Sequence, residues 1–224
     1  MSDPSIDLLQ QLVAIDSVNP SLVPNAAGEA RIARAIADHM RSLGLDVHVQ
    51  DAAPGRPNVI GVLETGAPGP SLMFCGHTDT VGVEGMRNPF DPVIRGDRLY
   101  GRGSQDMKSG VAAMIDAARV LAERRPRRGR LIVAAVIDEE YASVGADALV
   151  REWKADAAVV TEPTDLDTVS KALTERKWNV TSAALIWKAK NPVTLDGDKR
   201  AEVESFLADL DEDDDVQNIY VALA

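Results

Sequence analysis

The chain has 224 residues, of which 45% are hydrophobic, so it can bury a core in one large domain or two smaller ones. Its net charge of -11 argues against a surface that binds nucleic-acid phosphates or anionic lipid, because such binding depends on clustered Lys and Arg. The densest basic run, at residues 124–130, is read as a solvated loop. The acidic start and the lack of an apolar run of ~18 residues predict a cytoplasmic protein that contacts no membrane. The single cysteine, Cys75, suits a reducing compartment.

In chain order, helical spacing and short apolar runs alternate over the first 164 residues. Apolar residues at helical spacing predict helices over residues 6–13, 30–43, 107–124 and 145–153. Apolar or β-branched runs predict strands over residues 45–50, 58–63, 71–81, 131–140 and 157–162. This alternation predicts an α/β fold with a mostly parallel sheet and flanking helices.

After Thr164 the pattern changes. It predicts, in order, helix, strand, strand, helix and strand, over residues 166–177, 179–190, 192–195, 198–210 and 216–223. Counting residues 157–162 as a first strand gives the split βαββαβ order of a ferredoxin-like unit. We therefore expect two domains, 1–164 and 157–224, that share one strand. The acidic run at 211–215 is read as a solvated turn, since consecutive acids lack the alternating ligand spacing of a calcium loop.

His77 and Asp79 stand two residues apart in GHTDTV, at the end of an apolar run. On an extended chain, side chains two apart leave the same face, so the carboxylate can orient the imidazole. Metal-bound histidines usually donate their second ring N–H to such an acceptor. Taken alone, the pair is also what a satisfied structural histidine looks like.

Further acids follow strand ends elsewhere in the chain. Asp106 lies in a glycine-rich loop before a helix, Asp138, Glu139 and Glu140 follow an apolar strand, and Glu162 follows the next. Because adjacent residues at a strand end point to opposite sides, Glu139 and Glu140 are expected to do different jobs. Open α/β sheets gather ligands at the carboxyl ends of their strands. One imidazole with several carboxylates suits zinc, and a bridging carboxylate suits two metals ~3.5–4 Å apart. The alternative is a set of independent solvated strand ends.

These motifs resemble a known family, the dinuclear zinc aminoacylases and exopeptidases that include acetylornithine deacetylase, succinyl-diaminopimelate desuccinylase and glutamate carboxypeptidase. The resemblance covers about residues 6–164 and rests on SVNP (17–20), GHTDTV, the segment 88–110, DEE and EPT (162–164), in family order. It implies that His77 and Glu162 bind one zinc, that Asp106 bridges, and that Glu140 binds the second zinc.

The resemblance also implies catalytic roles for two residues. Asp79 would orient His77, and Glu139 would be the general base that takes a proton from the attacking water. The implied reaction is hydrolysis of an amide next to a carboxylate, in an N-acyl amino acid or a small peptide. The acyl group, the amino acid and the preferred metal are not indicated.

The chain departs from the family pattern in two ways. Family members carry an inserted lid domain and a late histidine that completes the second zinc site, whereas this chain has only His39, His48 and His77. His39 falls in a helix and His48 in an early strand, so neither is a plausible substitute. We therefore expect one zinc ion rather than two, with cobalt as an alternative, and weak or no turnover from a truncated catalytic half.

The last sixty residues resemble the C-terminal part of YebC-type regulators, most specifically in DDDVQNIY (213–220). Two alternatives follow: a non-enzymatic regulatory or interaction protein, and a chimera of two genes without evolved function. The acidic balance disfavours a nucleic-acid role. Half of a catalytic domain would also leave a sheet edge uncovered, so we expect self-association.

Overall fold

A computed structural model describes residues 3–124 and 128–163, together with residues 197, 200 and 201. The chain separates into two compact units, Met1–Pro163 and Thr164–Ala224. Of the helix predicted over residues 198–210, Arg200 and Ala201 are described, and both are helical. The other predictions for the second unit, namely its ferredoxin-like order, its acidic turn and its resemblance to YebC-type regulators, lie outside the described residues.

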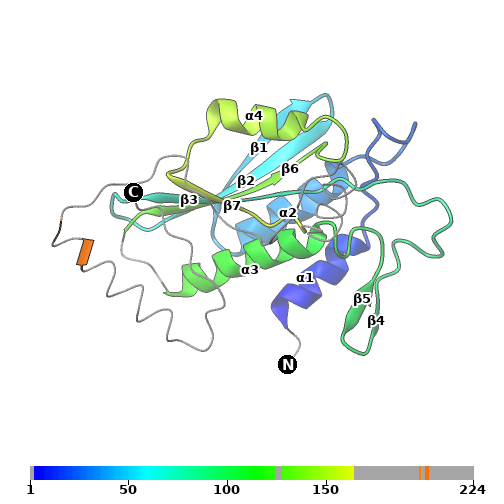
Figure 1. The fold of residues 1–224 in the computed structure, drawn as a ribbon, viewed down its shortest axis with the longest axis horizontal. Helices are drawn as coiled ribbons and strands as arrows, with labels where there is room; N and C mark the ends of the chain where they lie inside the picture. Colours follow the sequence, from blue (N-terminus) through cyan, green and yellow to red (C-terminus); the bar gives the residue numbers. More distant parts are fainter. Residues whose placement is uncertain (1–2, 125–127, 164–196, 198–199, 202–224) are drawn as a thin grey trace, which may run out of the picture. The chain divides into compact units, whose positions relative to one another are not determined.

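The first unit is built on a five-stranded sheet (Figure 1). Its strands, in spatial order, are β1 (Asp46–Ala53), β2 (Arg56–Glu64), β6 (Arg130–Val136), β3 (Ser71–His77) and β7 (Ala157–Val160). Strand β3 pairs in parallel with both β6 and β7, whereas β2 pairs antiparallel with both β1 and β6. The expected α/β fold with flanking helices is therefore present.

The prediction of a mostly parallel sheet holds for β3, β6 and β7 but not for the pairings of β2. Only Pro54 and Gly55 separate β1 from β2, and so short a connection can join only antiparallel strands. Four strands thus run in one direction and β2 runs against them, in a mixed sheet.

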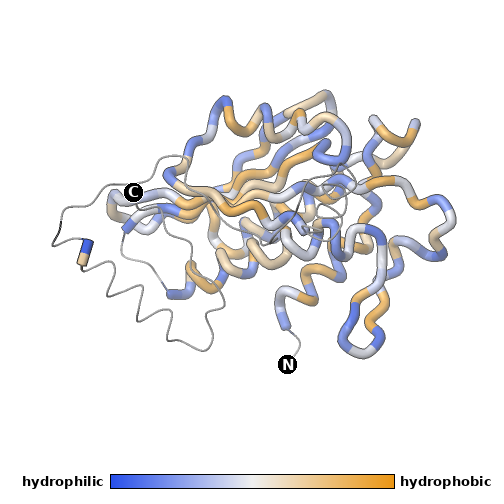
Figure 2. Tube along the Cα trace, viewed as in Figure 1, coloured by the Kyte–Doolittle hydropathy of each residue, from blue (hydrophilic) through white to orange (hydrophobic). Residues whose placement is uncertain are grey.

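Helices cover both faces of the sheet (Figure 1). On one face lie α1 (Pro4–Val13), α2 (Ala30–Ser42) and α3 (Lys108–Arg124), and on the other lies α4 (Val144–Glu152). Alternate residues of β6 serve the two cores: Leu131, Val133 and Ala135 pack with α1 to α3, and Ile132, Ala134 and Val136 pack with Leu149 of α4. A strand buried on both faces is continuously apolar, as the central strands are in Figure 2.

The sequence prediction missed a small hairpin, β4 (Val93–Arg95) and β5 (Arg98–Tyr100), which forms its own two-stranded sheet. Gly96 and Asp97 form its two-residue turn, and Gly96 has φ +63°. A Gly-Asp dipeptide between two short β-prone runs is a recognised hairpin signal. In the sequence, the hairpin comes after His77 and before Asp106, within the segment 88–110.

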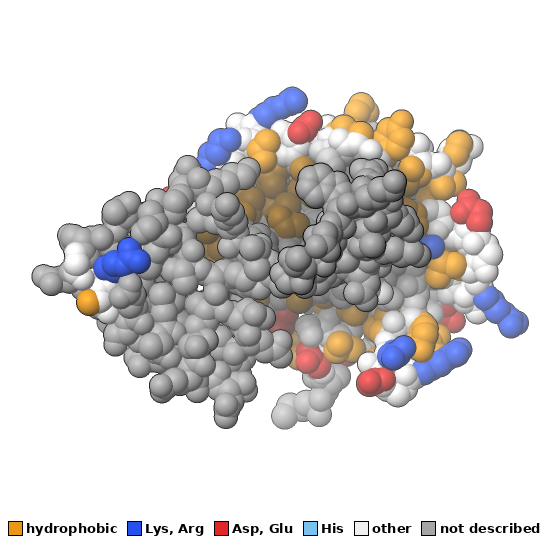
Figure 3. Space-filling view, in the orientation of Figure 1, with side chains coloured by type: hydrophobic (Ala, Val, Ile, Leu, Met, Phe, Trp, Pro, Cys, Tyr) orange, Lys and Arg blue, Asp and Glu red, His pale blue; other side chains and the backbone are white. Residues whose placement is uncertain are grey.

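The helices and the surface charges relate to two functions that the sequence disfavours, namely membrane contact and nucleic-acid binding. None of the helices in the described part of the chain is both long and apolar enough to cross a membrane. On the face drawn in Figure 3, the described Lys and Arg side chains are interspersed with Asp and Glu rather than gathered into one basic patch.

Candidate metal centre

The candidate site lies where β3, β6 and β7 end. The parallel pairing aligns His77 with Val136 of β6 and Cys75 with Val160 of β7. Glu162 lies two residues beyond Val160, as His77 lies two beyond Cys75, so the register brings both ligand candidates to the same edge of the sheet.

His77 is buried, at 1% exposure, and its two ring nitrogens face different groups. Nδ1 lies 3.0 Å from the carbonyl oxygen of Asp79 and 3.4 Å from its carboxylate Oδ1. Because both neighbours of Nδ1 are acceptors, Nδ1 carries a hydrogen in either charge state of the ring. The other nitrogen, Nε2, is therefore the one that can bind a metal.

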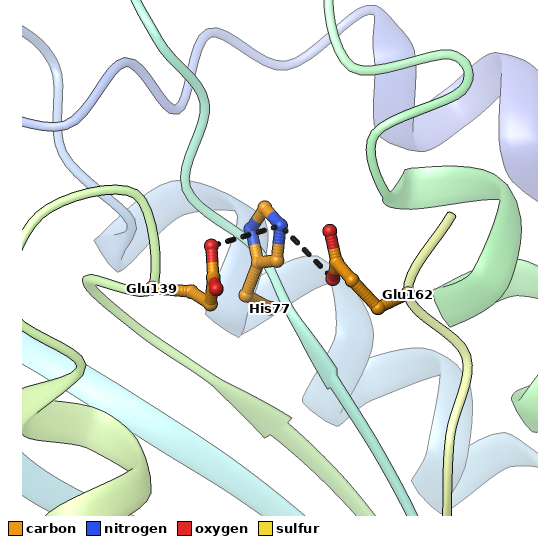
Figure 4. A group of neighbouring side chains, drawn as sticks. All are labelled: His77, Glu139 and Glu162. Atoms are coloured by element: carbon orange, nitrogen blue, oxygen red, sulfur yellow. Dashed lines mark ion pairs between the residues drawn. The ribbon is translucent and has the colours of Figure 1, made fainter. Parts of the chain in front are cut away.

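Three carboxylates converge on Nε2 of His77. Asp106 Oδ1 lies 3.0 Å away, Glu162 Oε2 3.5 Å and Glu139 Oε2 3.7 Å. Figure 4 shows the imidazole between the last two, which come from the loops after β7 and β6. Glu140 joins a second group with His77 and Asp106 whose ligand atoms also lie within 4.8 Å of one another. The structure thus brings together all the residues that the sequence suggested as metal ligands.

The acids after β6 lie in a turn rather than on an extended strand. Asp138 has a left-handed backbone, with φ +65°, and its carbonyl accepts a hydrogen bond of 2.6 Å from the Ser143 amide. The next two amides both donate to the carboxylate of Asp79: Glu139 N to Oδ1 at 3.1 Å and Glu140 N to Oδ2 at 3.2 Å. Strand alternation does not govern Glu139 and Glu140, because β6 ends at Val136 and both acids lie in the turn after it; Glu139 groups with His77 and Glu162, and Glu140 groups with His77 and Asp106.

Asp106 stands in a loop that only glycine permits. Gly103 has φ +77°, and a Cβ there would lie 2.9 Å from Thr80 Cγ2. The loop therefore packs its backbone against the segment after His77 while leaving the Asp106 side chain 52% exposed.

Lys108 anchors the other end of this loop. Its ammonium is buried and donates to the carbonyl oxygens of Leu12 at 3.0 Å and Ile15 at 2.8 Å, at the end of α1. Burial lowers the pKa of Lys108 to about 7, against the opposing charge of Asp16. Lys108 was not predicted from the sequence as part of the site, because a lysine after a loop gives no signal of burial.

The charges around His77 determine its protonation in the metal-free protein. Burial alone would lower the pKa of His77, but the hydrogen bond and charge of Asp79, with the charges of Glu162 and Glu139, outweigh burial and raise that pKa to about 9. Burial would raise the pKa of Asp79, but the hydrogen bond and charge of His77 lower it overall. A buried pair with this polarity is what orients a metal-binding imidazole.

The carboxylates facing Nε2 repel one another. Burial raises the pKa of Glu162 to about 7; His77 opposes this rise, and the charges of Asp106 and Glu139 add to it. Burial and the charge of Asp106 likewise raise the pKa of Glu140. A divalent cation would offset this excess of negative charge, and one imidazole with several carboxylates is a donor set that suits zinc. The residues therefore fit a metal ion.

A pocket of about 300 Å³ opens beside the acids and is lined by Val81, Gly101, Arg102, Gly103, Ser104, Gln105, Asp106 and Glu140. Arg102 is the cation of this lining, and its buried Nε has no hydrogen-bond partner among the described residues. A guanidinium in the lining of a pocket is a group with which an anionic ligand can pair.

The other two histidines lie away from the centre. His39 is in α2, and His48 is in β1, where it contacts Asp46 at 3.3 Å and packs edge-on against Trp153. Neither joins a metal-ligating group among the described residues.

Comparison with known proteins identifies the family to which the chain belongs. The model of peptidase family M20/M25/M40 matches residues 73–218, which is more than half of the chain. The chain belongs to this peptidase family. That match confirms the family resemblance seen in the motifs around His77, Asp106 and Glu140.

Two curated relatives of this M20-family protein are named as deacylases. It is 36% identical over 179 residues to a succinyl-diaminopimelate desuccinylase of Gluconacetobacter diazotrophicus, covering 74% of this chain and 44% of that one. It is 32% identical over 170 residues to an acetylornithine deacetylase of Photorhabdus laumondii, covering 73% and 43%. The chain thus spans less than half the length of these relatives.

Solved peptidases share the fold. A tripeptidase of Staphylococcus aureus superposes with a TM-score of 0.60 at 26% identity, over 72% of this chain and 43% of that one. Human carnosine dipeptidase 1 gives a TM-score of 0.60 at 25% identity, over 72% and 39%.

Proposed function

We propose that the chain is a zinc-dependent hydrolase of amide bonds in N-acyl amino acids or small peptides. The observation that carries this proposal is the convergence of Asp106, Glu139 and Glu162 within 3.0–3.7 Å of one buried imidazole nitrogen. Family membership and the deacylase and peptidase names of the relatives support the reaction class.

Four residues would hold the metal. His77 would bind one zinc through Nε2, and Glu162 would bind the same zinc through a carboxylate oxygen. Asp106 would serve both this metal position and a second one, to which Glu140 would belong. Asp79 would hold His77 with Nδ1–H pointing away from the metal. The chain brings no second histidine to Asp106 and Glu140, since His39 and His48 lie in α2 and β1. We therefore propose one tightly held zinc and weak turnover, with cobalt able to replace zinc.

Zinc bound there would act as a Lewis acid toward the amide carbonyl and would make water a stronger acid. Glu139 would then be the general base, because its carboxylate lies 3.7 Å from Nε2 and is 46% exposed, so it can reach water at the centre. Its Oε2 would take the proton from the attacking water and pass it to the leaving amine nitrogen.

Arg102 would bind the substrate's carboxylate. It lines the same pocket as Asp106 and Glu140 and is the cation of that lining. A carboxylate next to the scissile amide would pair with the guanidinium and hold the amide near the metal. This contact favours N-acyl amino acids and peptides with a free carboxylate over neutral amides.

Metal analysis of the purified protein tests the proposal. Elemental analysis is expected to find about one zinc or cobalt per chain, and the variant His77→Ala should lose it, because it removes the only imidazole in the described groups. His48→Ala is the matched control, since His48 is half-exposed in β1 and joins neither metal-ligating group of the described residues. An unaltered protein that holds no more metal than His77→Ala would overturn the proposal.

A further inference from the structure

A chain of buried polar groups lies behind the metal centre, on the side away from Nε2 of His77. Its hub is Arg56, at the start of β2, whose guanidinium donates to four side chains. Nε and Nη2 form a forked pair with Glu29 at 2.8 and 2.5 Å, and Nη1 donates to Ser21 Oγ at 3.0 Å. Nη2 also donates to Asn19 Oδ1 at 3.0 Å and to Asp138 Oδ1 at 2.9 Å.

Arg56 fixes the orientation of the Asn19 amide. Asn19 Oδ1 accepts from Arg56 Nη2 and, at 2.8 Å, from the Ser21 amide. Its Nδ2 must therefore face the opposite way, where it donates to Asp79 Oδ2 at 2.7 Å and Asp138 Oδ1 at 3.1 Å. A flipped amide would place its oxygen against two carboxylates and its NH2 against a guanidinium, so one orientation is strongly favoured.

Asp79 connects the Asn19 amide to the metal centre. Its Oδ2 accepts from Asn19 Nδ2 and from the Glu140 amide, and its Oδ1 accepts from the Glu139 amide and faces Nδ1 of His77. A displacement of this carboxylate would therefore move the imidazole and the turn that carries both glutamates.

The burial of these groups makes their pairing costly to disturb. Asn19, Glu29 and Asp79 are fully buried and Asp138 is 1% exposed. In such surroundings hydrogen bonds to charged groups are strong, and an unpaired partner is expensive. Glu29 and Asp138 belong to neither metal-ligating group of the described residues, and Asn19 links Arg56 and Asp138 to Asp79.

We infer that Asn19 and Arg56 are positioning residues of the metal centre: Arg56 sets the Asn19 amide, and Asn19 holds the Asp79 carboxylate that orients His77 and the Glu139–Glu140 turn. The inference rests on the proposed metal-binding role of His77. It assigns a task to the SVNP motif and to Arg56, which contact none of the proposed ligands' metal-facing atoms.

The test compares three variants of the full chain. Asn19→Leu keeps the size of the side chain but removes both donors, and Arg56→Lys keeps the charge but removes the fork. Ser21→Ala is the matched control: it removes a hydroxyl bonded to Arg56 and to Asp138, at 3.0 and 3.2 Å, but leaves Asp79 untouched. Thermal melting identifies which variants are folded.

Two measurements are made on each folded variant. Zinc affinity, measured by competition with a chromophoric chelator, should weaken about 10–100-fold in Asn19→Leu, about 3–10-fold in Arg56→Lys, and less than about 3-fold in Ser21→Ala. In the metal-free protein, the Nδ1–H resonance of His77, assigned by its loss in His77→Ala, should shift upfield and broaden in the first two variants only.

Each outcome decides one claim. Parent-like zinc affinity and an unchanged Nδ1–H resonance in folded Asn19→Leu would overturn the inference, and if that variant does not fold, the same result in Arg56→Lys would do so. An unaltered protein that holds no zinc would overturn the proposed function instead, while the resonance would still show whether Asn19 positions His77.

Discussion

The two sides of the candidate metal centre differ in what holds them. On the buried side, the side chains of His77 and Asp79 are 1% and 0% exposed, and Asp79 accepts hydrogen bonds on both oxygens. On the open side, Asp106, Glu139 and Glu162 are 52%, 46% and 33% exposed and face one another as like charges. The fold therefore sets the buried side by itself, whereas the open side is arranged for a cation. Two substitutions should separate these sides: Glu139→Gln on the open side should change the chemistry, and Asp79→Ala on the buried side should change metal affinity and folding.

The largest effect is expected from the open side. Glu139→Gln should lower the turnover of an N-acyl amino acid by about 10²–10⁴-fold, because it removes the proposed proton acceptor, while zinc content stays unchanged. Glu123→Gln, on the exposed surface of α3, is the control. Loss of zinc together with turnover would instead make Glu139 a ligand, as its grouping with His77 and Glu162 permits.

On the buried side, Asp79→Ala should weaken zinc binding about 10–100-fold, because His77 loses the group that orients it. It should also destabilise the protein by about 1–3 kcal/mol, since Asn19 and two amides lose a buried acceptor. Asp46→Ala, beside the exposed His48, should change neither quantity. Calorimetric titration and chemical denaturation measure both. A folded, parent-like Asp79→Ala would remove the distinction between the two sides.

Arg102→Met tests the proposed contact with the substrate. It should raise KM about tenfold for substrates with a free carboxylate and leave KM unchanged for their amidated analogues, with little change in kcat. Steady-state kinetics on a matched pair of substrates measure this. An equal effect on both substrates would mean that Arg102 supports the loop rather than the carboxylate.

Zinc affinity should rise with pH, because the metal competes with a proton on Nε2 of His77. The pKa of His77 is raised to about 9, so below that pH binding must release a proton, and affinity should increase about tenfold per pH unit between pH 7 and 8. Calorimetry in two buffers of different ionisation enthalpy counts the protons released. A pH-independent affinity would show that His77 is already neutral.

The smallest effect concerns stability without metal. The folded-state pKa of Glu162 is raised from 4.5 to about 7, so its ionisation destabilises the metal-free fold as pH rises through this window. Glu162→Gln cannot ionise, so it should melt at most a few degrees higher than the parent at pH 8 and no higher at pH 4. A lower melting temperature at pH 8 would mean that this carboxylate is already paired favourably.

The proximity of the candidate ligands was easier to predict from the sequence than the pairing of the strands around them. Polar residues at the ends of apolar strands mark the carboxyl edge of a sheet whatever the pairing of the strands, so His77 and Glu162 could be grouped, and the glycine-rich loop before a helix added Asp106. The antiparallel pairings of β2 depend on the two-residue turn before it, which the apolar pattern does not report. Family motifs, rather than spacing, supplied the individual roles, and these remain proposals.

The turn at Asp138 and the buried network could not have been read from spacing. Alternation applies only while a strand continues, and nothing in DEE shows that β6 has ended or that Asp138 is left-handed. Likewise, Asn19 and Arg56 lie 37 residues apart and meet only through the fold. Burial of a charged residue such as Arg56 or Lys108 is a tertiary property.

The position of Glu162 depends on the register of β7 with β3. Its carboxylate reaches His77 because β7 pairs Val160 with Cys75, and Glu162 and His77 each follow two positions later. Strand faces alternate with every residue, so deletion of one alanine from Ala157–Val160 should turn Glu162 toward the opposite face and away from His77. Many apolar substitutions in β7 would be harmless by comparison. The number of residues in β7 therefore matters more for the position of Glu162 than which apolar residues the strand contains.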